Sequence, residues 1–224
     1  EHHSQLILDI DSVWGTSRGG TPDSPLELPP VRERVRQAWS TTTAVNFCAK
    51  AYPTVASGHA DNAPLQVLAG FMRNGYLHRA IREQGGAYGG GASQDASSAS
   101  FRFFSYRDPR LQETLADFDA AIDWVISSEH KPHQLEEAIL GVIANLDKPA
   151  SPAGEAKQAY FNRAFGRTLA HRAQFRKQIL SITTADLKRV AQLYLSPEKA
   201  SIGIICNKES ADSLKIKNLE IINL

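Results

Sequence analysis

Residues 82–106 read REQGGAYGGGASQDASSASFRFFSY, and this stretch decides which fold we expect. Gly85 and Gly86 end a helix predicted over 63–83, because glycine readily adopts the left-handed backbone that closes many helices. The polar residues in the middle of the stretch predict a turn, and apolar and polar side chains alternate over 99–106 with the period of a strand. The stretch therefore predicts a helix followed by a β-hairpin.

The residues before this stretch continue the same pattern. Leu65, Leu68 and Met72 mark one apolar face of the helix predicted over 63–83. Upstream of it, a run rich in β-branched residues predicts a strand over 38–51 that ends at Pro53.

The residues after the hairpin predict mainly helices. Asp108 and Pro109 are typical of the N-cap and first position of a helix. Pro132 opens another helix, two or three more fill residues 154–195, and a last strand covers 200–206. Inward-facing positions of the first two helices are Leu111, Leu115, Phe118, Ile122, Val125, Leu135, Ile139, Val142 and Leu146. Strands and helices are partly segregated along the chain, which predicts an α+β fold: a mostly antiparallel sheet with helices packed on one face.

The beginning of the chain has a different character. Residues 5–11 are compatible with one short strand, and residues 15–30 hold glycines and prolines that are typical of a linker. We therefore expect residues 1–38 to be the tail of a preceding domain plus a linker, and 39–224 to form one α+β domain.

Composition limits the function classes. The 224 residues carry 25 Lys and Arg against 24 Asp and Glu, so the net charge of +1 gives no reason to expect nucleic acid or an anionic membrane as a partner. No run of about 18 apolar residues predicts a transmembrane helix. Cys48 and Cys206 each lie in an apolar run and are expected to be buried free thiols, which favours a reducing compartment such as the cytoplasm.

Two motifs resemble a metal site and a phosphate-binding loop, but their residue order does not match either kind of site. His130 and His133 are separated by Pro132, so they do not share one helix as a zinc motif requires, and Glu136 and Glu137 suit the first turn of the helix instead. The glycines of 85–91 follow a helix and enter a strand, the reverse of the order in phosphate-binding loops. They are compatible with a bulged strand or with a surface that a peptide approaches closely.

Arg82 and Tyr88 flank this glycine cluster. A guanidinium and a phenol near one helix end would make a suitable donor pair for a carbonyl that becomes an oxyanion. An arginine that favours the C-terminal dipole of a helix and a tyrosine in a strand are also commonplace, so the residues alone leave both interpretations open.

The strings Arg82–Gly91 and Ser105–Pro109 resemble the C-terminal half of the pitrilysin/insulysin class of zinc metalloendopeptidases, specifically its presequence-protease branch. Residues 146–152 and 181–187 are similar to that branch too, and the resemblance runs from about Trp39 to Asn207.

The resemblance implies four homologous α+β units, paired into two halves that close around an unfolded peptide. The N-terminal half carries the catalytic zinc, while this chain resembles the fourth unit, holds no metal and has that N-terminal half of the same polypeptide as its partner. By motif position, Arg82 and Tyr88 contact the substrate carbonyl and oxyanion, and four neighbouring glycines bind substrate: Gly85, Gly86, Gly89 and Gly90. The chain alone is then expected to be inactive.

Two other functions remain open at this stage. The chain could belong to a relative that lacks catalysis and acts as a scaffold, although the presence of both Arg82 and Tyr88 favours an enzyme. It could also be a stand-alone module that captures extended peptides by strand addition at a sheet edge.

Overall fold

The computed structural model describes residues 2–14 and 33–224, which divide into two units, Glu1–Glu33 and Arg34–Leu224. The first unit contains helix α1 (His2–Trp14), so the strand expected over 5–11 is wrong. Its apolar run, Leu6 to Leu8, is exposed, and a helix pairs the backbone groups of a segment without a partner strand. The linker expected over 15–30 lies outside the described residues.

The second unit is built on a six-stranded sheet with the order β3-β4-β2-β5-β1-β6. Its strands are β1 (Arg36–Ser40), β2 (Asn46–Pro53), β3 (Gly89–Asp95), β4 (Ser100–Asp108), β5 (Ser201–Cys206) and β6 (Glu220–Asn223). The first four strands in this order pair antiparallel, whereas β1 runs parallel to both of its neighbours. The predicted hairpin is present as β3 and β4.

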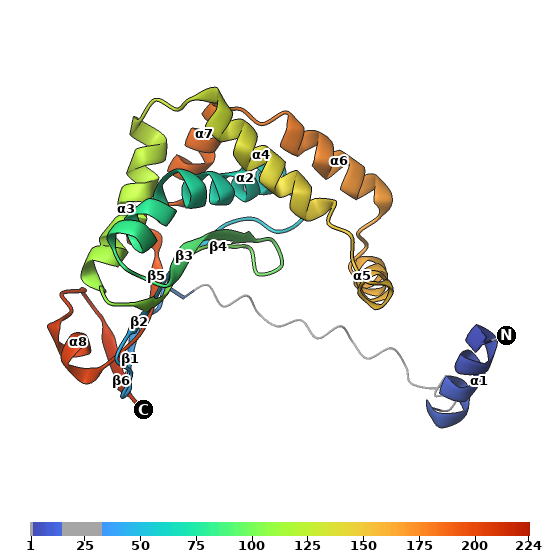
Figure 1. The fold of residues 1–224 in the computed structure, drawn as a ribbon, viewed down its shortest axis with the longest axis horizontal. Helices are drawn as coiled ribbons and strands as arrows, with labels where there is room; N and C mark the ends of the chain where they lie inside the picture. Colours follow the sequence, from blue (N-terminus) through green and yellow to red (C-terminus); the bar gives the residue numbers. More distant parts are fainter. Residues whose placement is uncertain (1, 15–32) are drawn as a thin grey trace. The chain divides into compact units, whose positions relative to one another are not determined.

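Helices cover one face of this sheet (Figure 1), where α2, η1 and α3 contact strands, α4, α6 and α7 pack on α2, and α5 lies apart from the sheet. They are α2 (Asn62–Met72), the π-helix η1 (Arg73–Gln84), α3 (Gln112–Ser127), α4 (Pro132–Leu146), α5 (Pro152–Ala164), α6 (Leu169–Leu180) and α7 (Thr184–Tyr194), followed by the short η2 (Pro197–Lys199) and α8 (Lys208–Ser213). The α+β architecture expected from the sequence is confirmed. The expected boundary at residue 38 falls inside β1.

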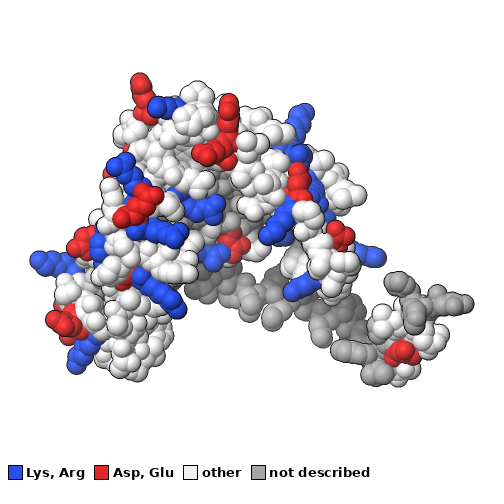
Figure 2. Space-filling model, in the orientation of Figure 1, with Lys and Arg blue, Asp and Glu red and all other residues white. Residues whose placement is uncertain are grey.

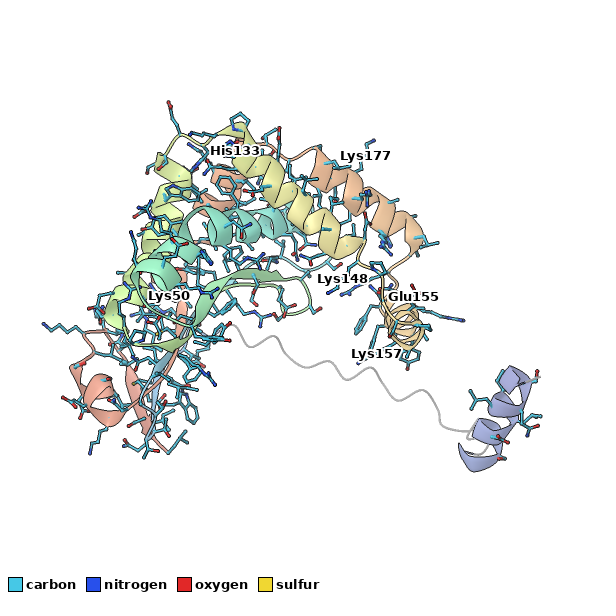
Figure 3. All side chains as sticks on the ribbon, viewed as in Figure 1. Lys50, His133, Lys148, Glu155, Lys157 and Lys177 are labelled. Carbon is cyan, nitrogen blue, oxygen red and sulfur yellow. The ribbon has the colours of Figure 1, made fainter. Side chains whose placement is uncertain are left out.

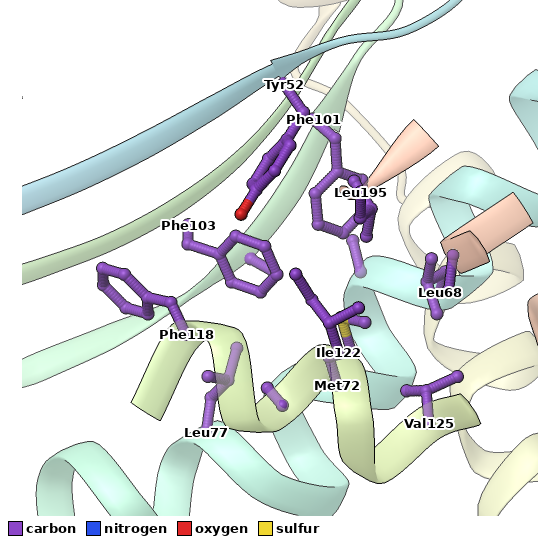
Figure 4. Packing of buried hydrophobic residues seen from close by; sticks show 14 of the residues in the cluster. Tyr52, Leu68, Met72, Leu77, Phe101, Phe103, Phe118, Ile122, Val125 and Leu195 are labelled. Carbon is purple, nitrogen blue, oxygen red and sulfur yellow. The ribbon is translucent and has the colours of Figure 1, made fainter. Parts of the chain in front are cut away.

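The hydrophobic core lies between the sheet and these helices (Figure 4). Tyr52 of β2 packs edge-on against Phe103 of β4, with ring centroids 6.0 Å apart. Phe103 in turn stacks on Phe118 of α3 at 5.5 Å. Ile122 and Val125 extend the same face of α3, so the apolar spacing in the sequence marks the buried side correctly.

Three local expectations differ from the structure. The strand expected over 38–51 is two strands, β1 and β2, separated by residues 41–45. The helix expected over 63–83 turns into the π-helix η1 after Met72. Its buried residues Leu77 and Ile81 are four apart, and this spacing fits an α-helix and a π-helix equally well.

Asp108 does not cap α3 directly, because that helix begins only at Gln112. Instead the fully buried carboxylate accepts a hydrogen bond from the Arg110 amide at 2.9 Å and another from the Thr114 hydroxyl at 2.8 Å. Asp108 therefore fixes the turn that joins β4 to α3, a role that the sequence did not show.

One cation lies inside this layer structure. Lys50 of β2 is 5% exposed and points toward α3 (Figure 3). Its ammonium group donates to both carboxylate oxygens of Asp119 at 2.7 Å and to the Leu115 carbonyl at 3.1 Å. The ion pair connects the middle of the sheet to α3.

No helix in the described ranges, 2–14 and 33–224, has the length and apolar character needed to cross a membrane.

Candidate functional site

The turn between η1 and β3 is held by three backbone hydrogen bonds. The Gly86 amide donates to the Arg82 carbonyl at 3.1 Å, and the Ala87 amide donates to the Ile81 carbonyl at 3.1 Å. Gly86 has a φ of +77°, which only glycine adopts without strain. The Tyr88 amide then donates to the carbonyl of Arg107 at 3.2 Å. Arg82 therefore lies at the start, and Tyr88 at the end, of one short turn that backbone hydrogen bonds hold in place.

Tyr88 points away from the core, with 63% of its surface exposed. Its ring lies 5.7 Å from the ring of Tyr106, and the guanidinium carbon of Arg107 lies 5.5 Å from its centroid. These neighbours support the sides of the ring and leave the phenol on the surface. Sequence reasoning missed Arg107, although it lies within the similar string Ser105–Pro109.

Arg82 is exposed in the last turn of η1, and within residues 33–224 no hydrogen bond or ion pair engages its guanidinium. Arg110, close in space to the same turn, is different: one of its nitrogens donates to Asp117 at 2.9 Å and to the Ala80 carbonyl at 3.0 Å. Arg82 is thus a cation available to a ligand, whereas Arg110 is occupied by the fold. The structure places Arg82 and Tyr88 on the same turn without a bond between them.

Three of the four predicted substrate-binding glycines have close neighbours within the domain. A side chain at Gly85 would collide with the Arg110 guanidinium, and one at Gly89 would collide with the Tyr106 ring. At Gly90 a Cβ atom would lie 2.9 Å from the Phe104 carbonyl oxygen. At Gly86, by contrast, the nearest atom would be a Pro109 carbon at 3.6 Å. The cluster lets the turn and β3 pack closely on their surroundings, and a role in substrate binding stays a prediction.

The histidines around α4 do not form a metal site. The His130 ring packs against Trp124 and Phe71, and its Nε2 atom lies 3.0 Å from the Val125 carbonyl. His133 is exposed at the start of α4, and Glu136 and Glu137 lie beyond its first turn rather than within it. Among the described residues no group of three or more His, Cys, Asp or Glu side chains could hold a metal ion.

Comparison with known families gives a direct match. Residues 36–207 match the family model described as the PreP C-terminal domain. The chain belongs to the PreP C-terminal domain family. This domain includes the hairpin, η1 and both Arg82 and Tyr88.

Relatives of the PreP C-terminal domain are proteases by name. The chain is 42% identical over 151 residues to "Presequence protease, mitochondrial" of Yarrowia lipolytica, a match that covers 67% of this chain and 15% of that protein. The chain thus spans about a seventh of the length of this relative. The expected location in a reducing compartment such as the cytoplasm is wrong, because the relatives are mitochondrial by name.

Solved structures agree on the fold of the PreP C-terminal domain. A protease from Helicobacter pylori has a TM-score of 0.70 at 14% identity, covering 91% of this chain and 52% of that one. The peptidase M16 inactive domain from Pseudomonas fluorescens has a TM-score of 0.65 at 15% identity, covering 92% of this chain and 51% of that one. The shared fold is therefore that of M16 peptidase domains.

Proposed function

We propose that this domain is the non-zinc, C-terminal part of a mitochondrial zinc metalloendopeptidase that degrades unfolded peptides. In this proposal Arg82 and Tyr88 donate hydrogen bonds to the substrate carbonyl next to the scissile bond. The names of the relatives support a mitochondrial protease that acts on presequences. The observation that carries the role of the domain is the turn between η1 and β3, which presents an unengaged guanidinium and an exposed phenol together.

The chemistry of the two side chains fits this task. Hydrolysis of a peptide bond passes through a tetrahedral species with negative charge on the former carbonyl oxygen. A phenol and a guanidinium on a rigid turn are hydrogen-bond donors that need little reorganisation when that charge develops. One preorganised donor of this kind typically lowers the barrier by about 3–4 kcal/mol. Arg107, close to the Tyr88 ring, places a positive charge beside the phenol.

The zinc ion belongs, by the resemblance, to the N-terminal half of the parent polypeptide. In the described ranges of this chain, no three or more His, Cys, Asp or Glu side chains are grouped so that they could hold such an ion. The metal would polarise the carbonyl and activate water there. This chain contributes Arg82 and Tyr88 from the other side of the bound peptide, so closure of the two halves would complete the site.

The surface is compatible with peptides of varied sequence. Acidic and basic side chains are interspersed over the face that Figure 2 shows, without a large area of one sign. Such a surface does not select strongly for one charge on the bound peptide.

The proposal is tested by comparing the activity of the full-length parent enzyme with that of its variants. Cleavage of an unfolded peptide, sensitive to a chelator, is measured for the wild type and for Arg82→Ala, with Arg163→Ala in exposed α5 as the matched control. We expect kcat to fall by about 100- to 1,000-fold in Arg82→Ala, because one charged donor is lost. Zinc content and Tm should stay unchanged, and Arg163→Ala should behave as the wild type. A wild-type kcat in Arg82→Ala, or peptide cleavage by the isolated 224-residue chain, would exclude this role.

A further inference from the structure

Positive charge is concentrated in residues 147–177, which include α5 and most of α6. This segment carries seven Lys and Arg against two Asp and Glu, whereas the other 193 residues carry 18 against 22. The net charge of +1 for the whole chain is thus an average over a basic segment, at +5, and an acidic remainder, at −4. The basic residues of the segment are Lys148, Lys157, Arg163, Arg167, Arg172, Arg176 and Lys177.

Large apolar side chains of the same segment lie at the surface. Phe161 in α5 and Phe165 just after it are 43% and 67% exposed, and Leu169 at the start of α6 is 84% exposed. The two phenylalanine rings stack, with centroids 6.2 Å apart. Contiguous exposed apolar groups of this kind mark interaction sites more often than single scattered ones do. We call these three side chains, together with Lys157 and Arg167, the α5 surface.

The two cations of the α5 surface lie beside its rings and are not used by the fold. Lys157 is four residues before Phe161, so both lie on the same side of α5. The guanidinium carbon of Arg167 lies 5.4 Å from the centre of the Phe165 ring. Within residues 33–224 neither cation forms an ion pair with a carboxylate. Both charges are therefore available to an external partner.

Helix α5 buries none of its 13 residues within the described part of the chain. Its start is fixed locally, because the Ser151 hydroxyl accepts a hydrogen bond from the Gly154 amide at 3.2 Å. A helix this short is only marginally stable in water without tertiary packing. A surface that takes up the apolar side chains of α5 would therefore also stabilise the helix.

We infer that the α5 surface docks on an anionic lipid bilayer. Basic side chains next to large apolar ones are typical of helices that lie in the membrane interface, where the cations meet lipid phosphates and the apolar groups enter the boundary of the acyl chains. With 13 residues, α5 is too short to span the hydrocarbon core, so it lies along the bilayer surface. The inference does not depend on the catalytic role proposed for Arg82 and Tyr88.

Other occupants fit the α5 surface less well. Unfolded peptides and single-stranded nucleic acids bind mainly at open sheet edges or in grooves, whereas α5 stands apart from the sheet (Figure 1). The cavities of about 420 Å³ beside α8 and about 210 Å³ beside α4 are both lined by residues outside the segment 147–177. A second copy would bring two basic segments together, and like charges across an interface oppose association.

Co-sedimentation of the full-length parent with lipid vesicles, in the absence of peptide, tests the inference. Vesicles of phosphatidylcholine alone are compared with vesicles of an equal mixture of phosphatidylcholine and anionic phosphatidylglycerol. We expect binding to the mixed vesicles, little binding to the neutral ones, and weaker binding at high salt because salt screens exposed charges. No binding to the mixed vesicles, or equal binding to both kinds, would overturn the inference.

Substitutions separate the α5 surface from the rest of the parent. Lys157→Gln and Arg167→Gln should each weaken binding to the mixed vesicles by about fivefold, because each removes one charge near the lipid phosphates. Phe165→Ser should weaken it by about tenfold or more, because a large apolar group no longer enters the interface. The matched controls, Lys208→Gln in α8 and Leu193→Ser in α7, replace exposed side chains elsewhere and should bind as the wild type does. The Tm should be unchanged in all five variants.

Two further results would overturn the inference. Binding to the mixed vesicles that Lys157→Gln, Arg167→Gln and Phe165→Ser all leave unchanged would assign it to another part of the parent. Binding of single-stranded RNA or of an acidic peptide that these variants weaken, without binding to vesicles, would assign the α5 surface to that partner. Each readout is binding rather than peptide cleavage, so the inference can fail while the proposed function holds, and the reverse.

Discussion

Arg107 holds its guanidinium carbon 5.5 Å from the centre of the Tyr88 ring, and its carbonyl accepts the Tyr88 amide at 3.2 Å. Arg107 makes both contacts from a backbone with a φ of +50°, which is uncommon for a residue other than glycine. Strained conformations of this kind persist where the surrounding structure determines them. The relationship orients the exposed phenol of Tyr88 in the candidate site.

Removal of this support should weaken catalysis modestly. Arg107→Ala in the parent removes a cation–π contact at an exposed position, worth about 0.5–1 kcal/mol. We therefore expect kcat to fall by about 2- to 5-fold, with Arg107→Lys closer to the wild type because it keeps the charge. Steady-state kinetics on an unfolded peptide measure this, and a loss in Arg107→Ala as large as that in Tyr88→Phe would show a direct role instead.

The close approach at Gly90 should make it sensitive to any side chain. Gly90→Ala places a methyl group 2.9 Å from the Phe104 carbonyl oxygen, so β3 and β4 must separate. We expect a loss of about 1–3 kcal/mol in the free energy of unfolding, measured by urea denaturation of the 224-residue chain. The matched control is Gly141→Ala in α4, where nothing lies within 4 Å and alanine should stabilise the helix by up to about 1 kcal/mol. Equal effects of the two substitutions would contradict the packing described.

Asp61 should make stability depend on pH. The hydrogen bond from Arg189 at 2.6 Å, together with one from Tyr194 at 2.7 Å, holds the pKa of this buried carboxyl below its usual 3.8. Its stabilising contribution is thus fully present above about pH 4 and is lost as the pH falls through the lowered, folded-state pKa.

Asp61→Asn should therefore reduce the free energy of unfolding at pH 7 by about 1.5–3 kcal/mol, the range for hydrogen bonds to a charged group. The difference from the wild type should shrink as the pH falls below about 4, in urea denaturation at a series of pH values. Exposed Asp212→Asn is the control and should show neither effect. If the difference in the free energy of unfolding between Asp61→Asn and the wild type grew as the pH fell, it would contradict this explanation.

Removal of Asp119 from the buried ion pair with Lys50 should destabilise the domain more than removal of Lys50. The Lys50 side chain is 6% exposed and that of Asp119 is 35% exposed. Asp119→Ala leaves a buried ammonium with only the Leu115 carbonyl, at a cost of about 3 kcal/mol. Lys50→Met leaves a carboxylate that water reaches and should cost about 1 kcal/mol or less. Urea denaturation of both variants measures the order, and the reverse order would show that the ammonium is better solvated than the structure indicates.

Much of the fold could be predicted because it depends on local patterns. The alternation over 99–106 and the apolar spacing from Leu111 to Val125 identified β4 and the buried face of α3. The helix α1 could not be predicted, because a short apolar run suits a strand or a helix equally. The partners of Asp108 are set by how β4 and α3 meet, which no local pattern encodes.

The candidate site was only partly predictable. Arg82 and Tyr88 came from a resemblance, and the structure adds that one turn presents both side chains at the surface. Spacing alone could not show that Arg110 and Tyr106 fill the space over Gly85 and Gly89, because these contacts join segments about 20 residues apart. Arg107 was missed for the same reason.

The central claim is that this domain supplies a hydrogen-bond donor to the reaction, and kcat of Tyr88→Phe in the full-length parent tests it most directly. The substitution removes one hydroxyl from an exposed ring, and Tyr160→Phe in α5, 70% exposed, is the matched control. The account predicts a kcat about 100-fold lower in Tyr88→Phe, with zinc content and Tm as in the wild type and no change in Tyr160→Phe. A wild-type kcat in Tyr88→Phe would contradict it.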